Sequence, residues 1–168
     1  MAPQTLNVKP VIDWLVAGAP PWRQAPEVLF DLCHRLQAAG LPLYRVAVFV
    51  RTLHPNVLGR GFIWHETNDK VEVNEAAYDF LESDQYLQSP IRAIFDEHGE
   101  IRRRLADPRC PLDFPVLADF RKEGVTDFIG LPLPFVNGEV HATTFATRRA
   151  GGCASSASIR CSTSTTRM

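Results

Sequence analysis

The chain has 168 residues, which is room for one domain and hardly for two. Hydrophobic residues make up 45% and charged residues 22%, the balance of a globular fold rather than of a disordered chain. The net charge of -1 argues against a general binder of polyanions, because binding to phosphates needs a surplus of cations. No apolar run reaches the roughly 18 residues of a membrane span, and no basic stretch leads into an apolar one as in a secretory leader.

The sequence carries no recognisable metal, cofactor or catalytic motif. Its four cysteines are scattered, without the C-x-x-C spacing of a zinc site or the density of a disulfide framework: Cys33, Cys110, Cys153 and Cys161. The glycine-rich phosphate loops, the zinc-protease motif and the nucleophile elbow are missing from the sequence. We therefore expect no cofactor, no metal, no catalytic residue and no enzyme activity in this chain, and a reducing, cytoplasmic location.

Two helices are predicted near the N-terminus. Residues 10–17 carry apolar side chains at i, i+3 and i+4 spacing, and Gly18 follows as a stop. A second helix begins near Pro26, since the missing N–H of proline costs nothing in a first turn. Its apolar stripe ends before Gly40, which closes the helix.

Strands dominate the rest of the chain. Alternating or β-branched runs predict strands over residues 43–53, 62–65, 71–73, 100–105, 125–134 and 139–147. Asn137-Gly138, between the last two, is the strongest hairpin pattern in the sequence. Further helices are predicted to start at Ser89-Pro90 and at Asp113. Strands joined by short turns imply an antiparallel sheet with helices covering one face, an α+β fold.

Two arginines stand on one face of the first strand. Arg45 and Arg51 are six residues apart, with Phe49 between them on the same side. A solvent-facing sheet edge, or ion pairs with the strand that contains Glu72, would explain both arginines structurally. In the functional interpretation the two guanidinium groups line a cavity and bind an anionic ligand bidentately. Both interpretations stay open on the sequence.

Three further residues join Arg45 and Arg51 as candidates for a ligand site: His54, Trp64 and Asp127. His54 flanks the first strand. Trp64 lies in the second strand, where tryptophan is more often part of a core than of a ligand cage. Asp127 lies inside a predicted strand, although Asp is depleted in strands, so it would either pair with a strand arginine or line a pocket.

The composition changes abruptly at the C-terminal end. From Ala150 to Met168 the chain is rich in Ser, Thr, Gly and Ala, and it holds few large apolar side chains. Such a segment buries too little surface to offset the entropy of ordering, so we expect a disordered tail over residues 150–168. A closing helix would be expected here, and none is predicted. A truncation or a frameshift is our hypothesis for this end.

Nine short segments, in order along the chain, carry a family resemblance. They are LCHRL at 32–36, AGLPL at 39–43, RTLHP at 51–55, GFIW at 61–64, SPIR at 89–92, IRRRL at 101–105, DFPVL at 113–117, LPLPF at 131–135 and TFAT at 144–147. Over about residues 10 to 150, the set resembles the N-terminal region of bacterial class III adenylate/guanylate cyclase proteins.

The resemblance implies a GAF-like regulatory domain over residues 1–149 that precedes a cyclase catalytic domain. The implied fold is a GAF-like antiparallel sheet with N-terminal helices packed on one face and the closing C-terminal helix missing. The metal-binding aspartates and the transition-state Asn and Arg of class III catalytic domains match no stretch of this sequence. The chain therefore resembles the regulator without the enzyme.

The implied role is a ligand-sensing module that modulates cyclic nucleotide synthesis in a full-length protein. The implied partners are a small-molecule ligand, a cyclase catalytic domain and a second copy in a homodimer, with no nucleic acid and no membrane. Two alternatives stay open. One is a stand-alone enzyme or binding protein for a small anionic metabolite that uses the Arg45/Arg51 strand face. The other is a ligand-free dimerisation module.

Overall fold

A computed structural model describes residues 6–18, 23–54, 57–97 and 99–148, with only the backbone for residues 53, 54 and 57. In chain order the elements are α1 (Lys9–Val16), α2 (Ala25–Ala38), β1 (Leu43–His54), β2 (Val57–His65), β3 (Glu72–Ala76), the 3-10 helix η1 (Tyr78–Glu82), α3 (Asp84–Leu87), α4 (Pro90–Glu97), β4 (Ile101–Arg103), α5 (Pro115–Lys122), β5 (Asp127–Pro134) and β6 (Val140–Thr147).

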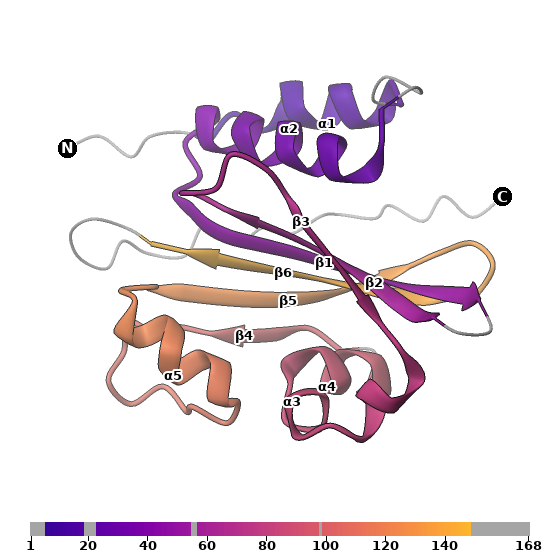
Figure 1. The fold of residues 1–168 in the computed structure, drawn as a ribbon. Coiled ribbons are helices and arrows are strands. Elements are labelled where there is room, and N and C mark those ends of the chain that lie inside the picture. Colours follow the sequence, from indigo (N-terminus) through magenta and orange to yellow (C-terminus); the bar gives the residue numbers. More distant parts are fainter. Residues whose placement is uncertain (1–5, 19–22, 55–56, 98, 149–168) are drawn as a thin grey trace, which may run out of the picture.

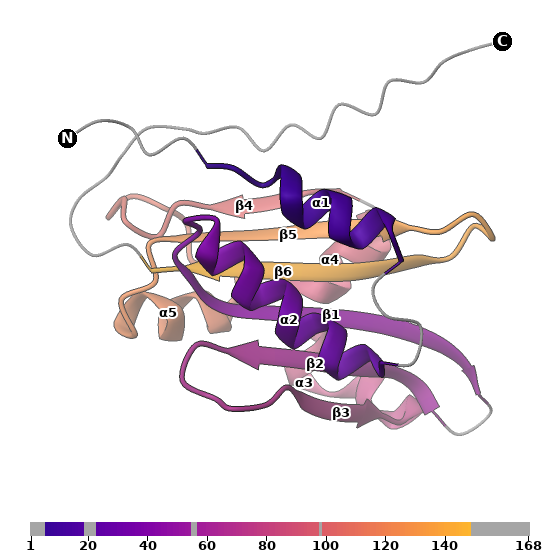
Figure 2. The ribbon, with the colours of Figure 1, turned by 90° about the horizontal axis from the view of Figure 1, so that it is seen from above.

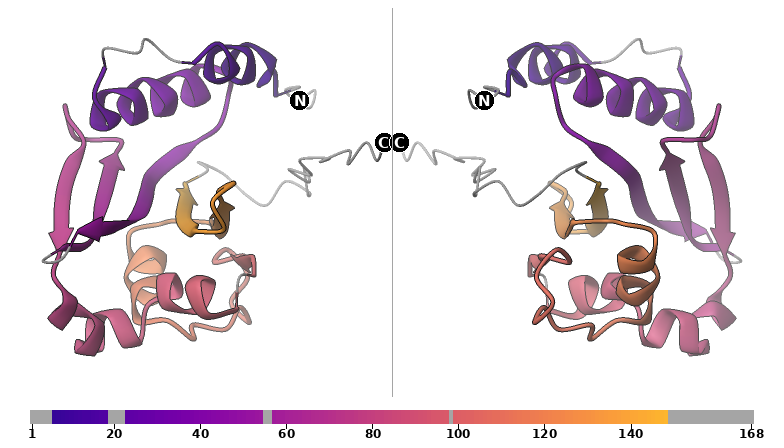
Figure 3. Two further views of the ribbon diagram at one scale, coloured as in Figure 1. Left: turned by 90° about the vertical axis from the view of Figure 1, so that its right-hand side faces the viewer. Right: turned by 90° about the vertical axis from the view of Figure 1, so that its left-hand side faces the viewer.

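The strands form one antiparallel sheet of six strands in the order β3-β2-β1-β6-β5-β4. Helices α1 and α2 lie on one face, and α3, α4 and α5 lie on the other (Figure 1). The side views in Figure 3 show the sheet between these two helical layers. The predicted α+β class, with an antiparallel sheet and N-terminal helices on one face, is confirmed, and the structure adds a second helical layer. The predicted tail and the missing closing helix fall on residues outside the described ranges.

Helix α2 covers the central strands from one side. Its first turn is fixed by a capping box between Gln24 and Glu27, and Gly40 follows its C-terminal end with a positive φ of 98°. Figure 2 shows α2 running over β1 and β2. The buried core between this helix and the sheet consists of Leu29, Cys33, Leu43, Val46, Trp64 and Val71.

A second core lies on the opposite face, beneath α3, α4 and α5. Most of its buried members come from β1, β4, β5, β6 and these helices, among them Ile94, Leu117, Phe120 and Phe128. Helix α4 approaches β5 closely because Gly130 has no side chain: a Cβ there would stand 2.7 Å from Cδ1 of Ile94. The lower layer is therefore packed tightly against the β5 half of the sheet.

A β-bulge at the start of β1 changes which face its residues occupy. The register with β6 shifts between Leu43 and Arg45, so that one extra residue, Tyr44, enters β1. Leu43 therefore packs in the core with α2, and Tyr44 packs in the core beneath α4 and α5. Simple alternation along 43–53 predicts Leu43 on the face of α4 and α5 and Tyr44 on the face of α2. This prediction is wrong for both residues because the bulge adds one residue to the strand.

The elements differ from the predictions most in the middle of the chain. Strand β2 begins at Val57 rather than at 62, and β4 has three residues, Ile101–Arg103, rather than the predicted 100–105. The 3-10 helix and α3 were not predicted, because segments of four or five residues are too short to show a helical apolar period.

Gly59 is expected to be required for the pairing of β1 with β2. A Cβ at this position would stand 2.6 Å from the carbonyl oxygen of Val50, and a backbone atom cannot move aside as a flexible side chain can. We expect Gly59→Ala to lower the free energy of unfolding by about 1–3 kcal/mol, measured by urea denaturation. Gly99→Ala is the matched control: its Cβ meets nothing closer than 3.9 Å, so we expect a change of about 0 to 1 kcal/mol in the stabilising direction. Equal effects of the two substitutions would contradict this account.

Candidate functional site

A cavity of about 720 Å³ lies between the sheet and the helical layer of α3, α4 and α5. Six aromatic side chains are part of its wall: Phe49, Phe80, Tyr86, Phe95, Phe120 and Phe128. This volume and this apolar lining are typical of a pocket for a small organic molecule. The cavity also contains three arginines, Arg45, Arg51 and Arg60, which is unusual for an apolar wall.

The part of β2 that borders the cavity contains two glycines. Gly59 and Gly61 both line the cavity, and Gly61 is paired across the strands with Phe49. A Cβ at Gly61 would lie 3.4 Å from the Phe49 ring, so even one added carbon would begin to fill this space. On the other half of the sheet, Gly130 is instead covered by Ile94. The Phe49 ring thus lies over Gly61 as the Ile94 side chain lies over Gly130.

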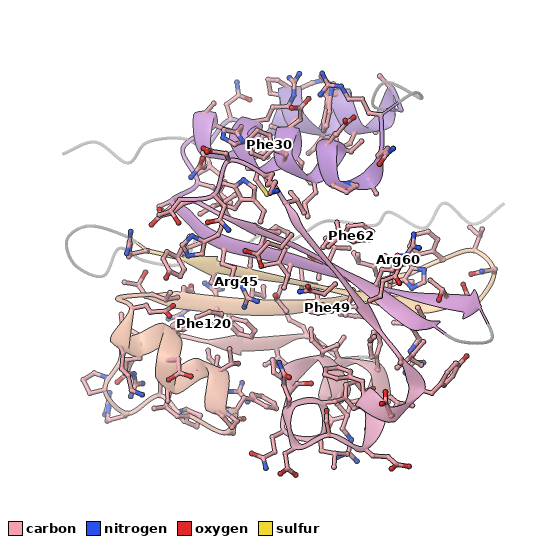
Figure 4. All side chains as sticks on the ribbon, viewed as in Figure 1. Phe30, Arg45, Phe49, Arg60, Phe62 and Phe120 are labelled. Carbon is pink, nitrogen blue, oxygen red and sulfur yellow. The ribbon has the colours of Figure 1, made fainter. Side chains whose placement is uncertain are left out.

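Arg45 lies at the α5 end of the cavity. Its guanidinium carbon is 5.5 Å from the centre of the Phe120 ring (Figure 4), a cation–π contact. No hydrogen bond or ion pair joins its side chain to another described residue. Burial lowers the pKa of Arg45 from its ordinary value, and the carboxylates of Glu123 and Glu72 act in the opposite direction without contacting it. Arg45 therefore carries a partly desolvated positive charge with no direct counter-ion among the described residues.

Arg51 lies on the same strand face, at the α4 end of the cavity. Its guanidinium carbon is 4.2 Å from the centre of the Phe95 ring. Its backbone N–H donates a hydrogen bond of 3.2 Å to Nδ1 of the buried His141, which anchors the main chain at this point. Across the described ranges, its side chain has no carboxylate within ion-pair distance. Arg51 is exposed, so it stands where the cavity meets solvent.

The acidic lining residues mostly have other partners. Glu75 forms an ion pair of 2.7 Å with Arg60, and Asp119 accepts a hydrogen bond of 3.0 Å from Lys122. Asp84 lies in the first turn of α3 and is exposed. The positive charges left without a paired carboxylate in this cavity, within the part of the chain that the structure describes, are therefore Arg45 and Arg51.

Of the five candidates from the sequence, the structure brings Arg45 and Arg51 into one cavity. Trp64 lies on the opposite face of the sheet, 1% exposed in the core beneath α2. Asp127 forms an ion pair of 2.7 Å with Arg102 of β4, and neither residue lines the cavity. His54 ends β1, and its side chain lies outside the description.

Among the described residues, neither arginine forms an ion pair with the strand of Glu72. The strand of Glu72 lies beside β2, and the Glu72 carboxylate accepts a hydrogen bond of 2.9 Å from the side chain of Asn68 rather than from an arginine. The pairing of Asp127 with a strand arginine, one of its two predicted roles, is found with Arg102. The sequence did not indicate Phe80 and Tyr86, because they lie in the short helices that its periodicity did not predict.

The described ranges contain neither a cluster of metal ligands nor an activated thiol at Cys33. Within them, no group of three or more His, Cys, Asp or Glu side chains is placed to hold a metal ion. Burial raises the pKa of the Cys33 thiol to about 12, so this cysteine stays protonated and is a poor nucleophile at neutral pH. None of the described helices is long and apolar enough to cross a bilayer.

Comparisons with known proteins give a likeness of fold and no family. No protein-family model matches the sequence, and no curated protein matches it. Among solved structures, the chain is similar to the GAF domain of a two-component sensor histidine kinase from Bacillus halodurans. The identity is 12% and the TM-score is 0.45, over 76% of this chain and 79% of that one.

A polar cluster closes the α5 end of the sheet next to Arg45. The Tyr44 hydroxyl donates a hydrogen bond of 2.9 Å to Oε2 of Glu123, which is the C-cap residue of α5. The guanidinium carbon of Arg148 is 4.8 Å from the centre of the Tyr44 ring, and Arg148 also pairs with Glu66 of the turn after β2. The cluster joins β1, α5 and the residue after β6 in one place.

The Tyr44 hydroxyl is expected to stabilise this junction. We expect Tyr44→Phe to lower the free energy of unfolding by about 1 kcal/mol, through loss of a hydrogen bond to a carboxylate. Thermal denaturation would show this as a fall in Tm of about 2–4 °C. Tyr86→Phe is the matched control, since the Tyr86 hydroxyl donates no hydrogen bond to any residue the structure describes. A fall in Tm of the same size in both variants would argue against a specific role for the Tyr44–Glu123 bond.

Proposed function

We propose that this chain is a ligand-sensing module that binds a small organic anion in the cavity between the sheet and helices α3, α4 and α5. The observation that carries the proposal is the pair Arg45 and Arg51, two guanidinium groups in one cavity without a paired carboxylate among the described residues. A partly desolvated charge is costly unless it is paired, so a site that keeps one is typical of a site that binds its counter-ion from solution. The aromatic wall supplies apolar contact for the rest of the ligand.

The regulatory part of the proposal concerns the full-length protein. We propose that ligand binding modulates cyclic nucleotide synthesis by a cyclase catalytic domain. The support is the resemblance carried by the nine sequence segments between residues 32 and 147. A cytoplasmic location and a homodimer belong to the same proposal. Sequencing the gene beyond codon 168 and translating it in all frames tests the link, because a class III catalytic core there would support it. An in-frame stop with no cyclase core downstream in any frame would count against it.

Replacement of Arg45 is expected to raise the stability of the free chain and to weaken its binding of anions. Without ligand, we expect Arg45→Met to raise the free energy of unfolding by about 1 kcal/mol, because an apolar side chain replaces an unpaired, partly buried charge. The same variant should lose most of the thermal stabilisation that organic anions give the wild-type chain. That stabilisation is about 2.7 kcal/mol at a hundredfold excess of ligand over its Kd.

The screen would use carboxylates, phosphate esters and nucleotides, each beside an uncharged amide or ester of similar shape, at constant ionic strength. Arg92→Met is the control variant, since Arg92 is an exposed residue of α4 outside the cavity. Arg92→Met should change neither stability beyond about 0.5 kcal/mol nor the response to anions. If Arg45→Met instead lowered the unfolding free energy and left the anion response intact, Arg45 would be a structural residue and the proposal would fail.

A further inference from the structure

The positions of the two arginines restrict the shape of the ligand, given the anion-binding function proposed above. Arg45 and Arg51 are six residues apart on one strand, and a strand rises about 3.3 Å per residue, so their Cα atoms are about 20 Å apart. Each side chain lies over a different helix, Arg45 over Phe120 of α5 and Arg51 over Phe95 of α4. In Figure 1, α5 lies under the left end of the sheet and α4 lies farther to the right. One small anion therefore cannot contact both guanidinium groups.

The surface between the two arginines is apolar and recessed. Phe49 stands between them on the same face of β1, and Figure 4 places it further along the strand than Arg45, away from Phe120. Beside Phe49, the neighbouring strand contributes Gly61, and the Phe49 ring lies over this glycine. A ligand that extends from one arginine to the other would lie against the Phe49 ring, so its middle must be apolar or aromatic.

The two ends of the cavity differ in their contact with water. Arg45 is half-buried and its charge lacks a direct counter-ion, whereas Arg51 is exposed at the opening. An ion pair formed away from water is screened less than one formed at the surface. The inner anion should therefore contribute more to affinity than the outer one.

We propose that the cavity binds an elongated organic dianion, with one anionic group at Arg45, the other at Arg51, and an apolar spacer packed on Phe49. Carboxylate and phosphate ends share the chemistry that a guanidinium group recognises, so the ends of the ligand can be of either kind.

The test is isothermal titration calorimetry of the whole chain with linear dicarboxylates of increasing length: succinate, adipate, sebacate, dodecanedioate and hexadecanedioate. Decanoate and dodecanoate, below their micelle concentrations, are the monoanionic partners of sebacate and dodecanedioate. We expect affinity to rise to an optimum at an intermediate length. At that length the dianion should bind about 10-fold or more tightly than the monoanion with the same number of carbons, the factor of one charge-assisted contact. A decane bisphosphate then distinguishes phosphate ends from carboxylate ends.

Variants assign the two ends. Arg51→Met should reduce the affinity for the dianion about 10-fold and leave that for the monoanion unchanged, which removes the difference between them. Arg45→Met should weaken both ligands, by a larger factor, because it removes the inner contact. Arg92→Met should bind like the wild type.

Three results would overturn the inference. The first is a monoanion that binds as tightly as its dianion while Arg45→Met weakens both, and this result leaves the proposed anion site standing. The second is inorganic phosphate that binds at two sites per chain, each of which is lost in one of the two arginine variants, while an apolar spacer between two anionic groups does not increase affinity. This result also leaves the proposed anion site standing. The third is no binding of any of these anions, or binding that neither arginine variant weakens, and this result removes the proposed function itself.

Discussion

Strand β1 lies at the centre of the sheet, and its side chains point alternately into two different helical layers. One set of residues, including Val46, packs under α2 in a dry core. The other set, Arg45, Phe49 and Arg51, faces the layer of α3 to α5 and lines the cavity. Because the side-chain period of a strand is two, a slip of one residue would bring both arginines into the core under α2. The register of β1 therefore determines both which residues pack in the core under α2 and which residues line the cavity.

The bulge at Tyr44 shows how this register is adjusted locally. It allows Leu43 to point into the core with α2 and Tyr44, the next residue, to point toward Glu123. Without the extra residue, alternation would place Tyr44 on the α2 face and leave Glu123 without its hydrogen-bond donor. The bulge thus allows Tyr44 to bond Glu123 of α5 while Arg45, the next residue, faces the cavity.

Much of the fold follows from local patterns in the sequence, whereas the cavity does not. Helix α2 has a proline in its first turn, an apolar stripe and a terminal glycine, and the β5–β6 hairpin has Asn137-Gly138, so each carries its own signature. The shared face of Arg45 and Arg51 also follows from strand period alone. Whether that face is covered depends on η1 and α3, which are too short to leave a pattern, and on how closely α4 packs on Gly130.

The two candidates that lie elsewhere illustrate the same limit. Trp64 is on β2, next to Ile63 of the cavity wall, and the alternation of side chains along the strand places it in the α2 core. Asp127 is unusual for a strand residue, yet its partner Arg102 comes from the edge strand β4, a pairing that depends on sheet order rather than on sequence spacing. Strand order and parity across several elements are long-range properties, and a single sequence specifies them weakly.

The electrostatics of the α5 end connect the cavity to the end of β6. The Glu123 carboxylate interacts electrostatically with Arg45 without contacting it, and it accepts a hydrogen bond from the Tyr44 hydroxyl. Arg148 donates a hydrogen bond of 3.4 Å to the backbone carbonyl of Glu123. An anion bound at Arg45 adds a second negative charge near Glu123, so it opposes the field that Glu123 already experiences from Tyr44 and Arg148. A ligand shifts a conformational equilibrium only through such a difference in interaction energy. The Tyr44–Glu123–Arg148 cluster is therefore where we expect occupancy of the cavity to affect Arg148, the residue after β6.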